Sequence, residues 1–215
     1  MKLHPVALAL AMSFSSAPAF AKDPPKAATK DAHSPAAGKK PADEKAAAQE
    51  AAMMAAWQKF ATPGEQQAWL QKMMAGSWTT SNKMWMGPGD PTSSTGTAEV
   101  KTILGDRYIE EEHTGTFMGK PFHGKGVTGY DNAKKKFVSV WVDTMGTGIM
   151  ISEGALAADG KTLNTVATST NPMNGEPETT RVVDHFEGNK RVSEFYSKGP
   201  DGKEVKMMEI TYTRK

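Results

Sequence analysis

The sequence contains no cysteine among its 215 residues. This absence excludes disulfide bonds, thiolate nucleophiles, cysteine-ligated metal sites and a lipid anchor on an N-terminal cysteine. The sequence also has no large excess of charge of one sign, because its 26 Lys and Arg residues nearly balance its 24 Asp and Glu residues. We therefore expect no basic field for nucleic acid, and nucleic acid is not a predicted partner.

Long apolar runs are absent as well. The short run Val6–Phe14 follows the positive charge of Lys2 and precedes the small-residue pattern Ala19-Phe20-Ala21. Such a run is too short to span a bilayer, and the pattern is typical of a secretory signal peptide that is cleaved after Ala21. The alternative is a buried N-terminal helix. We predict a signal peptide over residues 1–21 and an exported protein, periplasmic or secreted, without membrane insertion after cleavage.

Residues 22–44 lack any large apolar side chain, so nothing there offsets the entropy of ordering, and we predict a disordered linker. Residues 45–75 are predicted to form two N-terminal helices. The first carries an apolar stripe at helical spacing, formed by Met53, Met54, Trp57 and Phe60. Packing of this stripe on the following domain is the expectation, and contact with a membrane or a partner is the alternative.

The start of the second helix is predicted from capping chemistry. Thr62 is the expected N-cap, Pro63 fits the first helical position, and Glu65 completes a capping box. The helix is expected to run to about Met74.

From Gly76 onward the apolar period changes to two residues, which predicts strands. Nearly every gap between them contains Gly, Pro, Asn or Asp, the residues that turns favour. The predicted strands are 77–86, 94–104, 106–114, 122–130, 136–143, 147–156, 161–169, 178–187, 190–197 and 203–214. Because no helix lies between strands, a parallel sheet is excluded. We predict an all-β domain over residues 76–215, a ten-stranded antiparallel up-and-down barrel whose closure removes exposed edges.

Closure of this barrel predicts particular contacts. If the first and last strands pair, Trp78 lies under the guanidinium of Arg214 as a structural closure. The strand at residues 137–142 is apolar on both faces. We therefore expect Val138, Val140 and Val142 to face a cover formed by the N-terminal helices.

The chain resembles the lipocalin and fatty-acid-binding group of calycin barrels. The features that carry this resemblance are a short helix that leads into Gly76-Ser77-Trp78, the ten meandering strands and a terminal arginine. Over Thr62–Lys215 the chain also resembles the bacterial family catalogued as domain of unknown function 1579. The strings that carry this resemblance are Thr95-Gly96-Thr97-Ala98, Leu104-Gly105-Asp106-Arg107-Tyr108, Gly115-Thr116-Phe117-Met118-Gly119, Gly129-Tyr130-Asp131-Asn132, Met145-Gly146-Thr147-Gly148, Pro200-Asp201-Gly202-Lys203-Glu204 and Tyr212-Thr213-Arg214-Lys215. The resemblance implies a lipocalin-like barrel and no established activity.

Two patterns suggest chemistry and are weighed against simpler explanations. Gly124, Gly126 and Gly129 have the spacing of a dinucleotide fingerprint, but they lie in a strand that no helix follows, so no cofactor is predicted. Bends or the packing of a bulky neighbour explain them better. His113 and His123 would approach across a hairpin, and two histidines with Glu111 could bind a divalent metal. Solvated strand histidines are the default, so no metal site is predicted and the question stays open.

No Gly-x-Ser-x-Gly string occurs, and we predict no catalytic residues and no enzymatic activity. The leading hypothesis is a binding protein for a small apolar or amphipathic molecule held inside the barrel. The predicted ligand-binding residues, chosen by strand alternation, are Met84, Tyr130, Trp141, Asp143, Arg181, Glu194, Tyr196, Met208, Ile210 and Tyr212. Arg181 and Glu194 are the candidate polar anchors.

Three alternatives remain open. Asp143 and Glu194, if they face inward, could form structural ion pairs with Arg181 or Arg107 instead of orienting a ligand. The barrel could be filled and act as a structural or interaction protein. It could also be an enzyme that uses inward carboxylates for acid–base chemistry.

Overall fold

The computed structural model describes residues 41–199 and 201–215. The predicted signal peptide and linker residues 22–40 lie outside the described residues. Helix α1 (Pro41–Ala61) and helix α2 (Glu65–Met74) come first, so helical structure begins slightly before the expected linker end at residue 44. None of the helices in the described part of the chain is long and apolar enough to cross a membrane.

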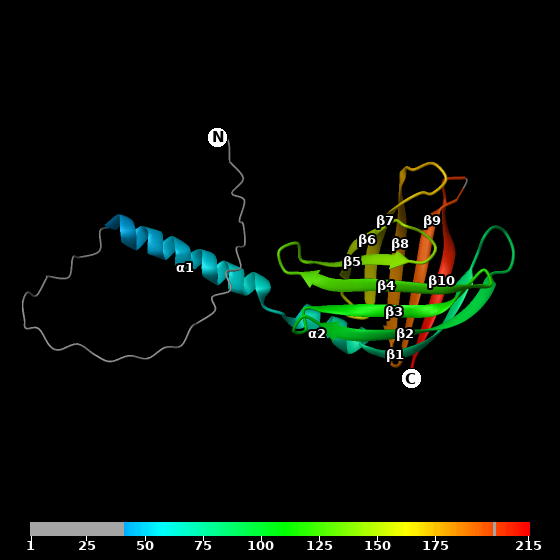
Figure 1. Cartoon of the computed structure of the whole chain (residues 1–215), viewed down its shortest axis with the longest axis horizontal. Helices are drawn as coiled ribbons and strands as arrows, with labels where there is room; N and C mark the ends of the chain where they lie inside the picture. The colour runs from blue at the N-terminus through cyan, green and yellow to red at the C-terminus, as the bar shows by residue number, and fades with distance from the viewer. Residues whose placement is uncertain (1–40, 200) are drawn as a thin grey trace, which may run out of the picture. The chain divides into compact units, whose positions relative to one another are not determined.

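Ten strands follow the helices and form one closed antiparallel barrel (Figure 1). They are β1 (Gly76–Met84), β2 (Thr92–Ile103), β3 (Tyr108–Phe117), β4 (Lys120–Asp131), β5 (Lys136–Asp143), β6 (Met150–Leu156), β7 (Thr162–Thr170), β8 (Pro177–Glu187), β9 (Lys190–Lys198) and β10 (Glu204–Arg214). Each strand pairs with its neighbours in sequence, and β1 pairs with β10 to close the ring. The predicted up-and-down barrel is confirmed.

The seam between β1 and β10 carries a cation–π contact. Trp78 lies opposite Arg214 in the register, and the guanidinium carbon of Arg214 is 4.2 Å from the centroid of the Trp78 ring. The guanidinium also donates hydrogen bonds to the carbonyl oxygens of Ala75 and, at 3.1 Å, of Met73. These carbonyls belong to the end of α2, where a helix leaves its acceptors unpaired and presents the negative end of its dipole. Arg214 therefore joins the barrel seam to α2.

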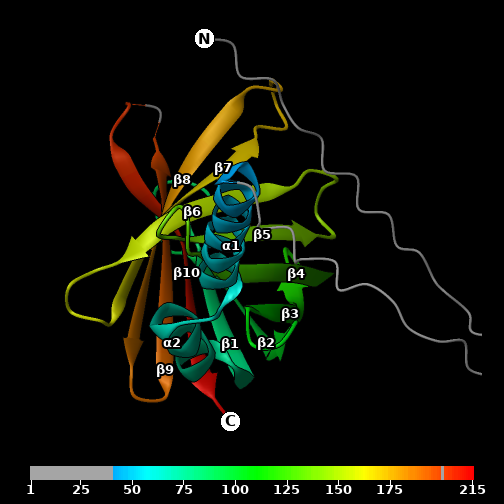
Figure 2. The ribbon, with the colours of Figure 1, turned by 90° about the vertical axis from the view of Figure 1, so that its left-hand side faces the viewer.

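Helix α2 closes one end of the barrel (Figure 2). Its side chains donate to carbonyl oxygens of two strand connections and of the end of β4: Trp69 to Gly160 at 3.0 Å, Gln71 to Asp106 at 2.8 Å and Gln67 to Tyr130 at 3.0 Å. Its buried apolar residues join the inward residues of this end in one core. That core, here called the plug, consists of Leu70, Met74, Trp78, Ala98, Val100, Ile109, Phe137, Leu163, Phe186, Ile210 and Tyr212.

The start of α2 differs from the prediction. The N-cap is Gly64, whose N–H donates to Gln67 Oε1 at 2.8 Å. The hydroxyl of Thr62 instead donates to the carbonyl oxygen of Gln58 at 2.6 Å, at the end of α1. The expected capping box between Thr62 and Glu65 is therefore wrong, because Thr62 bonds backward to the preceding helix.

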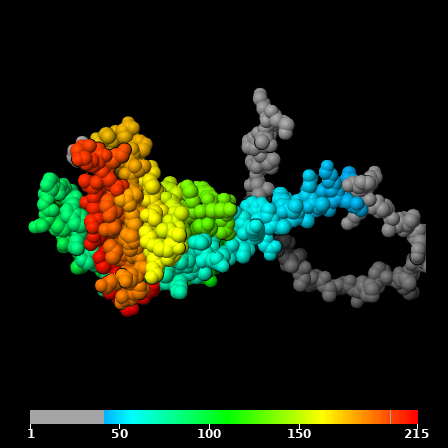
Figure 3. Space-filling view, turned by 180° about the vertical axis from the view of Figure 1, so that it is seen from behind, coloured from blue at the N-terminus to red at the C-terminus, as the bar shows by residue number. Residues whose placement is uncertain are grey.

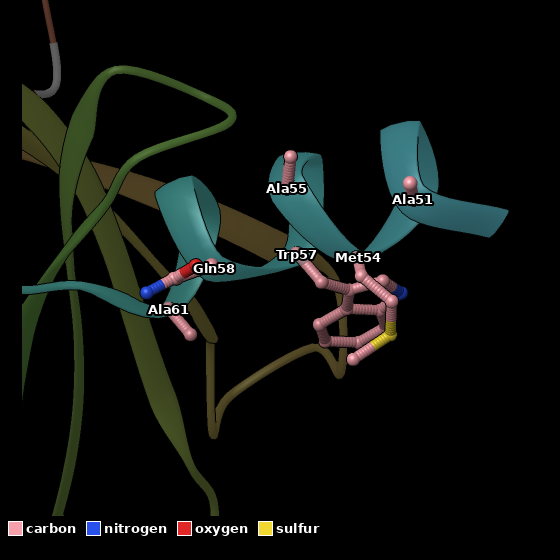
Figure 4. Close-up of a pocket in the computed structure, with 6 residues that line it drawn as sticks. All are labelled: Ala51, Met54, Ala55, Trp57, Gln58 and Ala61. Carbon is pink, nitrogen blue, oxygen red and sulfur yellow. The ribbon is translucent and has the colours of Figure 1, made fainter. Parts of the chain in front are cut away.

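The expected helical cover over the outer face of β5 is also wrong. Val140 and Val142 remain 41% and 44% exposed, because α2 packs across the barrel end instead of its side. The apolar stripe of α1 is exposed as well, with Trp57 at 56%. Met54 and Trp57 point to the same side of α1 and border a hollow formed by this helix alone (Figure 4). The expected packing of this stripe on the barrel is not observed.

The Arg214 contact yields a stability prediction. Replacement of Arg214 with Ala removes the cation–π contact and leaves the last carbonyls of α2 without their donor, so we expect a loss of about 2 kcal/mol in unfolding free energy. Urea denaturation followed by tryptophan fluorescence measures it. Lys203→Ala is the control, since the Lys203 side chain is 84% exposed. An unfolding midpoint for Arg214→Ala equal to that of the control contradicts this role.

Candidate functional site

Polar side chains from five strands converge inside the barrel, next to the plug. The cross-strand register points each of them inward. Those on β1, β3, β8 and β10 share the faces that carry the plug residues of these strands, and on β9 Arg191 and Ser193 lie opposite Phe186 and Asp184. We call this group the central cluster. Its members are Thr80, Glu111, His113, Asp184, Arg191, Ser193 and Tyr212.

Arg191 is the hub of the central cluster. Its Nε donates to Asp184 Oδ1 at 2.9 Å, and its Nη1 donates to Glu111 Oε2 at 3.3 Å. The side chains of Arg191, Glu111 and Asp184 are only 12%, 9% and 7% exposed. Strands β3 and β8, which supply the carboxylates, lie on opposite sides of the ring. One buried cation thus bridges two walls, and the formal charge of the three groups is negative.

Hydroxyl groups complete the bonding of the two carboxylates. Tyr212 Oη donates to Glu111 Oε1 at 3.0 Å, and Ser193 Oγ donates to Asp184 Oδ1. Each carboxylate therefore accepts two hydrogen bonds, which offsets part of the cost of burying it. Nearby, Thr80 Oγ1 lies 3.1 Å from His113 Nε2.

The protonation states follow from burial and neighbouring charge. Burial acts to lower the pKa of Arg191, but Asp184, Tyr212 and Glu111 outweigh it, so that the pKa rises and the guanidinium stays charged. Burial, reinforced by Glu111, raises the pKa of Tyr212 well above its ordinary value and keeps the hydroxyl as a donor. Burial lowers the pKa of His113 despite the opposing effect of Glu111, so this imidazole is neutral at neutral pH.

The half of the barrel that lies beyond the central cluster, away from α2, is not covered by a helix of the described chain. Its inward side chains include several large apolar ones, and each of these is half-buried, so it is not fully removed from solvent. We call this region the open half. These apolar residues are Met84, Phe117, Phe122, Trp141, Met150, Phe195 and Met208.

Two glycines of β4 keep Trp141 against the wall of the open half. A side chain on Gly126 would place its Cβ 2.8 Å from Trp141 Cε3, and one on Gly124 would collide with Cζ2, on the far side of the same six-membered ring. The indole therefore occupies the space that side chains on these two residues would fill. Its Nε1 donates to Asp143 Oδ2 at 2.9 Å, which fixes the ring. Trp141 lines the lumen as a flat surface.

Seven of the ten predicted ligand-binding residues face inward, at three different depths. Met84, Trp141, Asp143 and Met208 lie in the open half. Ile210 and Tyr212 lie at the level of the central cluster. Tyr130 packs against the plug, with its ring centroid 5.0 Å from that of Phe137, and is far from the open half.

The other three predicted residues lie on the outer face of the β8–β10 wall, which is orange to red in Figure 3. Arg181 pairs with Glu204 at 2.6 Å and stacks on Tyr196, with its guanidinium carbon 4.1 Å from the ring centroid. Glu194 accepts a hydrogen bond from Lys206 at 3.0 Å. The assignment of Arg181, Glu194 and Tyr196 to the lumen is wrong, because a shift by one residue exchanges the two faces of a strand.

The two candidate metal ligands do not come together. Opposite His123 in the register lies Thr114, the neighbour of His113, so His113 faces the lumen while His123 faces solvent. Within residues 41–199 and 201–215 no group of three or more His, Asp and Glu side chains is arranged to hold a metal ion. Asp143 has no ion pair with Arg181 or Arg107, and accepts hydrogen bonds from Trp141 and the Met145 amide.

Comparisons with known proteins identify the fold. Residues 62–214 match the family model described as "Protein of unknown function (DUF1579)". Among solved structures, that of Rv2717c from M. tuberculosis is similar, with a TM-score of 0.53 and 12% identity, over 68% of this chain and 97% of that chain. No curated protein matches the sequence. At this identity the structural likeness concerns the fold alone.

The central cluster yields a prediction with a matched control. Replacement of Arg191 with Leu leaves two buried carboxylates without their cation, so we expect a loss of about 3 to 5 kcal/mol in unfolding free energy. Arg181→Leu removes an arginine that likewise pairs with a carboxylate and stacks on a tyrosine, but outside the barrel, and we expect a much smaller loss. Denaturant unfolding of both variants measures the difference. Equal losses contradict the hub role of Arg191.

Proposed function

Because the chain belongs to the DUF1579 family, whose description names no activity, we propose its function from the geometry of the barrel. The protein is an exported binding protein of lipocalin-like architecture. It holds one small apolar or amphipathic molecule in the open half and carries out no reaction on it. The proposed site comprises the inward residues of the open half, with the central cluster as its floor.

The difference between the two barrel ends carries this proposal. At one end α2 and the plug fill the interior, and Leu70 and Ile109 are each only 1% exposed. At the other end aromatic and methionine side chains point inward but stay half-buried. Large apolar side chains that keep contact with solvent inside a concave wall are typical of a ligand site, because a bound molecule removes that surface from water.

The same features favour binding over the two alternatives. A filled structural barrel would bury its inward aromatic side chains at both ends, whereas Phe117, Phe122 and Phe195 are only half-buried. An enzyme that uses inward carboxylates would need one that is free to exchange a proton. Glu111 and Asp184 each accept two hydrogen bonds, one of them from the same guanidinium. This arrangement suits a fixed floor better than an acid–base pair.

The proposal predicts that the barrel binds N-phenyl-1-naphthylamine, a neutral apolar fluorophore, with one molecule per chain. Thr180 faces the lumen in the open half, where its Oγ1 lies 3.1 Å from Ser197 Oγ. Replacement of Thr180 with Trp should obstruct the lumen and weaken binding by about tenfold or more. Titration followed by probe fluorescence measures the affinity.

Thr179→Trp is the control for this experiment. Thr179 is adjacent on the same strand but exposed on its outer face, so the same change there leaves the lumen free. The control should bind the probe as the unaltered protein does. If neither the unaltered protein nor the control binds the probe, or if both variants bind it equally, the proposed site in the open half is wrong.

The export part of the proposal has its own prediction. If residues 1–21 are a signal peptide, expression of the full chain in a bacterial host gives a mature protein that begins at Lys22. Intact-mass measurement on the periplasmic fraction and the culture medium tests this. A full-length product that remains in the cytoplasm contradicts export.

A further inference from the structure

We infer that the open half selects a molecule with a positively charged headgroup, such as an amphipathic primary amine in its protonated form; this inference rests on the proposed function. It concerns the chemistry of the ligand, which neither the fold nor the family description assigns. Charge balance, hydrogen-bond balance and the nature of the wall support it independently.

The charge balance of the lumen is negative. Below the rim of the open half, the register points three carboxylates inward, those of Glu111, Asp143 and Asp184, against the single guanidinium of Arg191. His113 also faces this space and is neutral, because burial lowers its pKa. Arg214 faces inward only at the closed end, where it donates to the carbonyl oxygens of α2. The lumen therefore carries more formal negative than positive charge.

Arg191 is not free to receive an anionic headgroup. Its Nε and Nη1 already donate to Asp184 and Glu111, and its guanidinium lies over the Tyr212 ring, with the guanidinium carbon 4.5 Å from the ring centroid. An anion that approached it would meet both carboxylates, which repel it in a medium of low dielectric constant. The same two carboxylates attract a cation.

The hydrogen-bond balance points the same way. The donors of Tyr212, Ser193 and Trp141 are all directed at carboxylates. In contrast, the Oδ1 atom of Asn82 is buried and has no hydrogen-bond partner, while its Nδ2 donates to Ser94 Oγ at 3.3 Å. Asn82 lies opposite Ile210, one step from the Thr80–Tyr212 pair toward the open half. A ligand N–H or O–H group would supply the missing donor.

The wall of the open half suits a cation that carries an apolar chain. Trp141 presents an indole face that the neighbouring glycines hold flat, and Phe117, Phe122 and Phe195 add aromatic surface. Aromatic faces attract cations, most strongly where water is excluded. The same rings and the methionine side chains bury an alkyl chain. An ammonium headgroup near the central cluster, with its chain along this wall, meets the negative charge and the aromatic surface, and its N–H groups are the kind of donor that Asn82 Oδ1 lacks.

The test compares three probes that share an octyl chain: octylammonium, octanol and octanoate. Each displaces bound N-phenyl-1-naphthylamine from the full-length protein, at neutral pH and below its micelle concentration. We expect octylammonium, which is protonated at neutral pH, to bind most tightly and octanoate most weakly, with about a tenfold or larger difference between them. Asp143→Asn should reduce this ratio severalfold. Glu153→Gln, which removes a carboxylate from the outer surface, should leave the ratio unchanged.

The outcomes separate this inference from the proposed function. If the fluorophore binds but the three octyl compounds compete equally, or if octanoate competes best, the headgroup inference is overturned while the binding function stands. If no octyl compound displaces the fluorophore, the headgroup inference is likewise overturned. Failure of the fluorophore itself to bind overturns the proposed function.

Discussion

A guanidinium held in the middle of a barrel requires negative charge around it, and this constraint organises the structure. Arg191 reaches Asp184 on β8 and Glu111 on β3, which lie on opposite sides of the ring. Buried ion pairs contribute little net stability compared with apolar packing, yet the loss of one partner is costly. Once the arginine is present, the carboxylates and their hydroxyl partners must keep their positions. The central cluster thereby divides the interior into two compartments with different properties.

The compartment next to α2 is the packed core of the barrel, and the open half is the site that we propose for binding. Trp78, Phe137 and the apolar side chains of α2 fill the first. Arg214 ties this end together, since it contacts both the barrel seam and the end of the helix. Hydrophobic burial concentrated at one end allows the other to keep large side chains partly exposed. The buried core of the closed end thus contrasts with the open half, whose large inward side chains are half-buried.

Much of the fold could be predicted from the sequence, because turn residues at regular spacing and a two-residue apolar period are local signals. The site was less accessible. Arg181, Val182, Val183 and Asp184 place one apolar and one charged residue on each face of β8, so alternation did not show which face is inward. Arg191 and Glu111 are 80 residues apart, and their pairing depends on barrel closure and register. The glycines of β4 indicated a bulky neighbour, but only the register identifies it as Trp141.

The central claim is that the open half holds a small molecule, and native mass spectrometry of the protein purified from its own cells tests it most directly. We expect a species that is heavier than the bare chain by one small molecule, and collisional activation should release that molecule. A Thr180→Trp variant prepared in the same way should show the bare chain without it. Detection of the bare chain alone, under conditions in which a known lipocalin complex survives, would contradict the account.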